Sequence, residues 1–245
     1  MRFTSVAVLV LLGGAILSSC SSLSPQNQAE SMVETTQAEP ESEPLTALQT
    51  KVNALQQQVN LYKEQSSIDN IDARVLTQFQ AAVALKQQGH FIQAQQQLIA
   101  LSEQHPNYSG IWLQLALISG ELNKDNVEGK LGAMSSYLNK ATTANPLNYQ
   151  AHNELALVLR QQGQFNEALR HYELALKSWP AFSTAYFNRG ILYDLYLGEK
   201  TLALADFEVY QALTKDESRQ LQGWIIDLQR QIKRAEQNEQ SGATL

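Results

Sequence analysis

Residues 149–182 have the sequence YQAHNELALVLRQQGQFNEALRHYELALKSWPAF, and this stretch decides the fold. Its apolar residues recur at steps of three and four, which predicts two amphipathic helices. Gly163 and Gln164 supply the turn between the helices, and Pro180 closes the second one. Small residues are required where the two helices cross closely. The residues that carry the pattern are Leu155, Ala156, Leu159, Phe165, Ala168, Tyr172 and Ala175.

Three prolines end helical patterns at a regular spacing. They lie in His105-Pro106, Asn145-Pro146 and Trp179-Pro180, so that the separations are 40 and 34 residues. A period of 34 residues with this pattern of small, aromatic and turn residues resembles the tetratricopeptide repeat family. The resemblance implies an all-α fold, a right-handed superhelix of about four helix-turn-helix repeats.

The neighbouring units follow the same pattern with departures. An earlier unit begins near Val75, and the next one contains about six extra residues around Asn123 to Gly132, which we expect to form a longer exposed loop. A fourth unit has an extra residue before its turn at Gly198 and no closing proline. Such departures are typical of a terminal repeat.

A capping helix follows the fourth unit, from Asp216 to about Gln237. Its apolar residues form one stripe, made of Leu221, Trp224, Ile225, Leu228 and Ile232. We therefore assign residues 67–238 to the repeat domain with its C-terminal cap. Residues 239–245 are expected to be a disordered tail.

Residues 45–66 have a heptad pattern that predicts an N-terminal helix. Its stripe is Leu45, Leu48, Val52, Leu55, Val59 and Tyr62, which is shorter than a convincing coiled coil. Three roles fit this helix: it pairs with a second copy in a dimer, it packs onto the repeats as a cap, or it lies in their groove. The pattern does not choose among them.

The N-terminal residues have the three-part pattern of an export signal: Arg2, an apolar run from Val6 to Leu17, and small residues up to Cys20. Leu17-Ser18-Ser19-Cys20 resembles the lipobox of bacterial lipoproteins, which implies a signal peptide over 1–19 and lipidation (diacylglycerol, palmitate) of Cys20. Acyl chains on Cys20 would make membrane attachment effectively permanent. Residues 20–44 then form a lipidated tether, which we expect to be disordered because it has few large apolar side chains.

The residue after the cysteine bears on localisation. In lipoproteins of Gram-negative bacteria an Asp at that position retains the protein in the inner membrane, and here the residue is Ser21. The resemblance therefore favours the outer membrane, with the body of the protein in the periplasm.

The family resemblance also implies a binding groove lined by the first helix, helix A, of each repeat. Carried onto this sequence, positions 5, 9 and 12 of helix A supply a mainly apolar floor with a sparsely charged rim. The predicted partner-binding residues are Phe79, Val83, Lys86, Leu113, Leu117, Asn153, Leu157, Arg160, Phe187, Ile191 and Asp194. The competing possibility is that the 45–62 helix or the cap fills this groove.

Composition and motifs give no support to catalysis, and we expect no enzymatic activity, cofactor or metal. The four histidines lack metal-binding spacing, and Glu128-Gly-Lys-Leu-Gly132 lacks the glycine spacing of a phosphate loop. His152 and His171 are expected to have packing or surface roles. A net charge of −6, of which residues 1–50 carry −4, argues against a nucleic-acid surface.

These observations together favour a non-enzymatic adaptor lipoprotein that binds a protein partner, as a peptide or helix, in a cell-envelope complex. Pilus or secretion machinery and peptidoglycan machinery are the systems that the resemblance suggests, and the repeat pattern does not choose between them. Two alternatives remain open: an accessory or hydrolytic factor acting on the cell wall, and a homo-oligomeric structural protein joined through residues 45–62.

Overall fold

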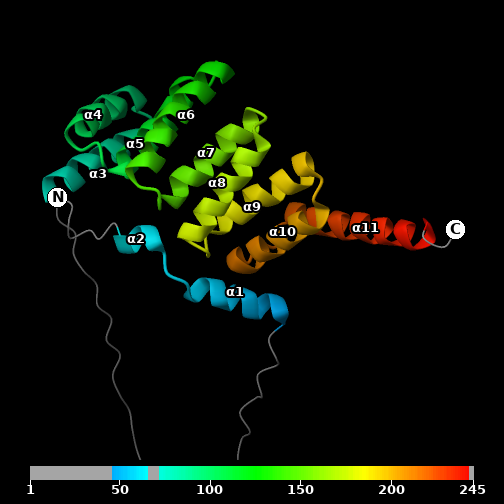
Figure 1. Ribbon diagram of the computed structural model, residues 1–245. Helices are drawn as coiled ribbons and strands as arrows, with labels where there is room; N and C mark the ends of the chain where they lie inside the picture. The colour runs from blue at the N-terminus through cyan, green and yellow to red at the C-terminus, as the bar shows by residue number, and fades with distance from the viewer. Residues whose placement is uncertain (1–45, 66–71, 243–245) are drawn as a thin grey trace, which may run out of the picture. The chain divides into compact units, whose positions relative to one another are not determined.

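The computed structural model describes residues 46–65 and 72–242, all of which belong to one compact unit, Pro44–Leu245. The predicted signal peptide, Cys20 and the predicted tether lie outside the described residues. Within them the secondary structure is helical (Figure 1). The helices are α1 (Ala47–Gln57), α2 (Leu61–Gln65), α3 (Ala73–Gln87), α4 (Phe91–Gln104), α5 (Ser109–Leu122), α6 (Val127–Ala144), α7 (Tyr149–Gln161), α8 (Phe165–Ser178), α9 (Ser183–Leu192), α10 (Lys200–Thr214) and α11 (Arg219–Gly242).

Eight of these helices form four consecutive pairs, α3–α4, α5–α6, α7–α8 and α9–α10, which confirms the predicted repeats. Alanines at the crossings have no exposed surface, which lets the helices approach closely: Ala82, Ala94, Ala116, Ala141, Ala156, Ala168 and Ala175. In the fourth pair the close approach uses Gly190, where an added Cβ would lie 2.8 Å from a ring carbon of Phe207. Any larger residue there would push α9 and α10 apart.

The turns inside three of the pairs contain the expected glycines. Gly89, Gly163 and Gly198 all have positive φ, between 74° and 82°, a conformation that costs glycine little. In the second pair the predicted long loop is wrong. Only 123–126 connect α5 to α6, because Asn126 caps α6 by accepting a hydrogen bond from the backbone N–H of Gly129 at 3.0 Å. The inserted residues therefore lengthen the helix.

The turns between repeats are closed by one recurring hydrogen bond. The carbonyl of each closing proline accepts from the side chain that lies six residues later, although the three donors differ chemically. The bonds run from Trp112 Nε1 to Pro106 (2.7 Å), from His152 Nε2 to Pro146 (2.9 Å) and from Tyr186 Oη to Pro180 (3.1 Å). The proline spacing seen in the sequence thus marks the hydrogen-bonded turns that connect one repeat to the next.

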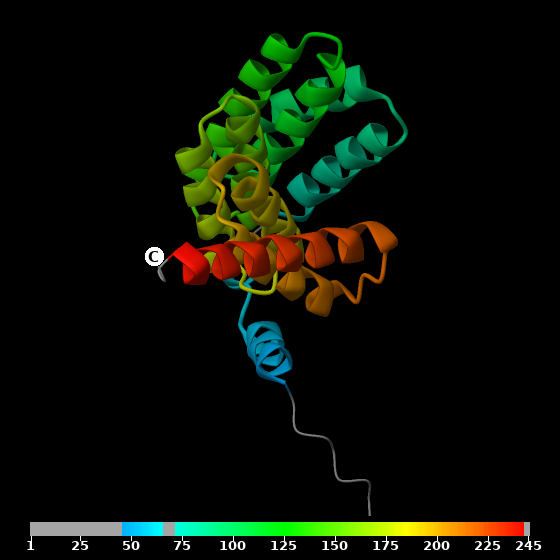
Figure 2. The ribbon, with the colours of Figure 1, turned by 90° about the vertical axis from the view of Figure 1, so that its right-hand side faces the viewer.

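The C-terminal end of the helix stack is covered by α11, which lies beside α10 (Figure 2). Leu221, Ile225 and Leu228 are buried against α10, as the apolar stripe predicts. The helix continues to Gly242, so it extends beyond the predicted end of the cap at residue 238 into the stretch expected to be disordered.

The predicted heptad helix is two helices with a break at 58–60. Gln58 is extended, and Asn60 begins the next turn by accepting a hydrogen bond from the backbone N–H of Lys63. The segment 46–65, called the strap below, packs on the repeats, since Leu48, Leu55 and Tyr62 join a core cluster with α7, α8, α9 and α10. Val52 is 1% exposed.

Tyr62 fastens the strap through a chain of polar contacts. Its hydroxyl lies 3.1 Å from the hydroxyl of Ser109, which also accepts from the Asn148 side chain at 3.0 Å. Asn148 in turn caps α7 by accepting from the backbone N–H of Ala151. Tyr62 also meets the ring of Tyr149 edge-on, with 6.0 Å between ring centroids. The strap is therefore attached to the starts of two different repeats.

We expect Tyr62→Ala to release the strap while the repeats stay folded. The change removes the hydroxyl contact and the ring contact, and hydrogen exchange should show faster exchange of the amides of 47–65 with unchanged protection of α7 and α8. Val59→Ala is the control, because Val59 is 49% exposed on the same segment. Equal exchange in Tyr62→Ala and the wild type would show that the strap is held by α1 alone.

Candidate protein-binding site

The predicted groove residues divide by their position on helix A. The four at position 9 are all partly exposed aliphatic side chains, one in each repeat: Val83, Leu117, Leu157 and Ile191. Each lies on the first helix of its pair, so the helix stack repeats an apolar side chain along this face. A row of this kind suits contact with an extended or helical protein segment.

The residues at position 5 pack between repeats. Fewer of the predicted groove residues are therefore available to bind a partner. Leu113 is 4% exposed and Asn153 is 1% exposed, and Asn153 accepts a hydrogen bond from the Asn188 amide at 3.0 Å. Phe79 lies next to Gly110 at the start of the neighbouring α5. Position 5 faces the next helix A, so these side chains hold the repeats together.

Phe187 is the clearest example of this packing role. Its ring lies 4.9 Å from Tyr210, 5.8 Å from Trp224 and 5.9 Å from Phe207, measured between ring centroids. Trp224 belongs to α11, so at the fourth repeat the cap covers the predicted groove residue. At Phe187 the groove is therefore filled by the cap, which is one of the two possibilities that the sequence left open.

The charged residues at position 12 have separate environments. The Lys86 ammonium donates to the Gln114 side chain at 2.5 Å, and burial lowers the pKa of Lys86. Asp194 pairs with Lys200 at 2.6 Å. The guanidinium of Arg160 lies 5.9 Å from the centre of the Tyr196 ring. Lys86 and Gln114 thereby connect the first two repeats across the predicted rim.

The strap does not use the predicted groove residues. Its core partners within the described residues are Tyr149, Leu176, Tyr186 and Val209, with Trp179 and Phe182 at the turn after α8. The ammonium of Lys63 also lies 5.7 Å from the Trp179 ring. Of the three roles that the heptad pattern left open, the structure shows the strap packed on the repeats, along the turns between them.

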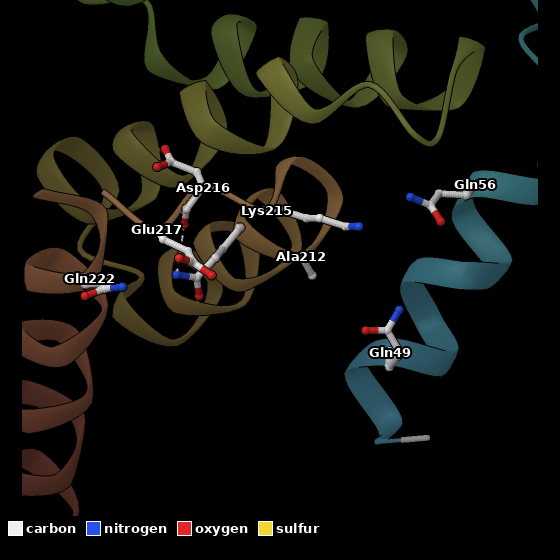
Figure 3. A pocket seen from close by; sticks show the side chains of 8 residues that line it. Gln49, Gln56, Ala212, Lys215, Asp216, Glu217 and Gln222 are labelled. Carbon is white, nitrogen blue, oxygen red and sulfur yellow. Dashed lines mark hydrogen bonds between the residues drawn. The ribbon is translucent and has the colours of Figure 1, made fainter. Parts of the chain in front are cut away.

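A polar cleft of about 630 Å³ lies where the strap meets the corner between α10 and α11 (Figure 3). Its lining consists mainly of amide and charged side chains. The lining residues are Gln49, Gln56, Gln211, Ala212, Lys215, Asp216, Glu217 and Gln222. This cleft could not be predicted from the sequence, because its lining residues come from both ends of the described chain.

The two predicted packing histidines contact each other directly. His152 Nδ1 and His171 Nδ1 are 2.9 Å apart, and His152 Nε2 donates to the carbonyl of Pro146. Burial disfavours the charged form of both rings, and in a neutral His152 that donates through Nε2 the Nδ1 atom accepts from the Nδ1–H of His171. Burial, the neighbouring His152 and Arg170 together lower the pKa of His171 to about 4, and burial lowers the pKa of His152. The packing role is confirmed.

Residues 46–65 and 72–242 offer neither a metal-binding cluster nor a membrane-spanning helix. No group of three or more His, Cys, Asp or Glu side chains lies close enough there to hold a metal ion. Over the same residues, none of the helices has the length and apolarity needed to cross a membrane.

Comparison with known proteins identifies the class of the repeats. Residues 153–218 match the tetratricopeptide repeat family. The solved structure of PilF from Pseudomonas aeruginosa is similar, with a TM-score of 0.55 and 19% identity, over 65% of this chain and 69% of that one. Two structures of MamA align with TM-scores of 0.49 and 0.48, at 16% and 17% identity, over 70% and 69% of this chain and 96% and 83% of theirs.

The helix pairs, the turn glycines and the family match over residues 153–218 show tetratricopeptide repeats in an all-α fold. No curated protein matches the chain in sequence. Proteins of this repeat class are generally protein-interaction scaffolds, and that is the general role that the fold supports.

Proposed function

We propose that this protein is a non-enzymatic adaptor that binds a protein partner on the helix A face of its repeats during assembly of a cell-envelope complex. The observation that carries the proposal is the row of partly exposed aliphatic residues at position 9, repeated once in each helix pair. At position 5 Leu113 and Asn153 are buried, whereas the residue at position 9 keeps exposed surface in every repeat. A repeated apolar row left partly exposed marks an interaction surface.

The proposal includes the membrane anchor inferred from the sequence. Lipidation at Cys20 attaches the chain to the outer membrane on its periplasmic side, and residues 21–44 are the predicted spacer between the lipid anchor and the repeats. The supporting features are the lipobox-like Leu17-Ser18-Ser19-Cys20 and Ser21 after it. Labelling of cells with a radioactive or alkyne-bearing palmitate tests the anchor, and a Cys20→Ser chain that still takes up label would contradict it.

The partner is sought by photo-crosslinking in living cells with a probe at Leu157. Leu157 is chosen because it is partly exposed on helix A, whereas Phe187 is packed against α11. We expect one discrete envelope protein to crosslink from position 157, and no such adduct from Arg170, which is exposed on α8. If position 157 crosslinks only to residues of the same chain, the helix A face is occupied internally and the proposal is wrong.

A further inference from the structure

The turn inside the fourth repeat differs from the other turns inside repeats. It contains the extra residue seen in the sequence, which the chain accommodates as a π-helical turn, Tyr193–Leu197, before Gly198. Turns of this kind are rare and are found frequently at functional sites. Here the turn places Leu195 and Tyr196 in solvent, 66% and 46% exposed, although both are large apolar side chains.

Two residues of the third repeat contact the ring of Tyr196. The ring of Phe165 lies 4.8 Å from the Tyr196 ring, and the Arg160 guanidinium lies 5.9 Å from it. Arg160, Phe165, Leu195 and Tyr196 are called the turn patch below. The patch therefore combines an aromatic stack, an exposed leucine and a positive charge at the junction of two repeats.

Arg160 lacks an acceptor. Its Nη1 atom is buried and has no hydrogen-bond partner among residues 46–65 and 72–242. The ion pairs within the described residues are Arg189–Asp206 and Lys200–Asp194, so the carboxylate of Asp194, two residues before Tyr196, is already paired. The charge of Arg160 is therefore not balanced by an ion pair within the described residues, and a carboxylate bound at this partly exposed side chain would supply one with a charge-assisted hydrogen bond.

We propose that the turn patch binds a protein segment that places an Asp or Glu carboxylate against Arg160 and a large apolar side chain against Leu195 and Tyr196. The positive charge of Arg160 selects the carboxylate by charge complementarity, and the exposed apolar pair selects its neighbour. The assignment rests on the proposed function, because it names the partner chemistry at the rim of the same helix A face. The bound protein would thus contact both the position 9 row and the turn patch.

The test uses the purified full chain and a phage-displayed library of random dodecapeptides. We expect the selected peptides to combine an acidic residue with a large apolar one. Tyr196→Ala should weaken binding of the labelled consensus peptide, measured by fluorescence anisotropy, by at least about tenfold. Ile92→Ala is the matched control, because Ile92 is 63% exposed on α4 in the first repeat. The affinity of this variant for the consensus peptide should equal that of the wild type.

The role of Arg160 is tested with a paired change in the peptide. Arg160→Gln should weaken binding of the acidic peptide. It should not weaken binding of the peptide in which the acidic residue is replaced by the corresponding amide. Circular dichroism melting of each variant confirms that it is folded. Equal losses for the acidic and amide peptides would overturn the assignment of a carboxylate to Arg160.

The remaining outcomes separate this inference from the proposed function. If Leu157→Ser abolishes binding and Tyr196→Ala does not, the helix A face binds protein and the turn patch inference is wrong. If neither variant weakens binding, both are wrong. If sedimentation shows a wild-type dimer that Tyr196→Ala dissociates, the occupant is a second copy of the chain, which also overturns the inference.

Discussion

Replacing Phe187 with alanine should lower the free energy of unfolding by about 3 kcal/mol, because it leaves a cavity between three aromatic rings. Phe207, Tyr210 and Trp224 all lie within 6 Å of the Phe187 ring, centroid to centroid. The loss removes contacts with α10 and with α11 together, so the cap should detach at a lower temperature than in the wild type. Urea unfolding and thermal unfolding, each followed by circular dichroism and by tryptophan fluorescence, to which Trp224 contributes together with Trp112 and Trp179, measure the two effects.

The control for this prediction is Ile92→Ala. Ile92 is a large apolar residue on the surface of α4, and truncation of such a residue changes stability by no more than about 0.5 kcal/mol. An unchanged midpoint for Phe187→Ala, together with loss of partner capture, would contradict the packing role. Phe187 would then be a groove residue, as the family resemblance implies.

Acidification should destabilise the third repeat through the His152–His171 pair. The pKa of His171 is about 4 in the folded protein, against 6.5 unfolded, so the unfolded chain binds more protons between these values. Stability is therefore complete above pH 6.5 and falls as the pH drops toward 4. The shift in the pKa of His171 corresponds to a loss of as much as about 3 kcal/mol in the free energy of unfolding, since one pKa unit is about 1.4 kcal/mol.

His171→Gln removes the titrating ring and should flatten this part of the pH profile. Melting temperatures of the two proteins, measured between pH 7.5 and about 4, should differ most at neutral pH and converge in acid. His90→Gln serves as the control, because His90 is exposed at the start of α4 and contacts neither His152 nor His171. A constant difference between His171→Gln and the wild type at every pH would show that the pair does not titrate.

The repeats could be predicted because their determinants are local. Gly163 is needed for a left-handed turn residue, and Ala156 and Ala168 are needed where two helices cross. Pro180 ends a helix because it lacks a backbone donor. Each requirement concerns residues within one period of 34, so it repeats visibly along the chain.

Features that depend on contacts between repeats could not be predicted in the same way. Position 5 was assigned to the groove, but Phe187 and Asn153 face the next helix, and no local pattern records that neighbour. The contact between His152 and His171 joins two helices of one repeat and needed the crossing geometry. The exposed turn patch had one sequence signal, the extra residue before Gly198, whose conformation the sequence did not indicate.

The strap changes how the repeats can unfold. In a simple solenoid each unit interacts only with its neighbours, and the ends fray one unit at a time. Here α1 packs on α10 from a point more than a hundred residues earlier in the chain, and Tyr62 joins the starts of α5 and α7. The last repeat therefore cannot open without losing a contact to the first described helix, and folding must close a long loop before that contact forms. The strap therefore couples the stability of the fourth repeat to that of the second and third repeats.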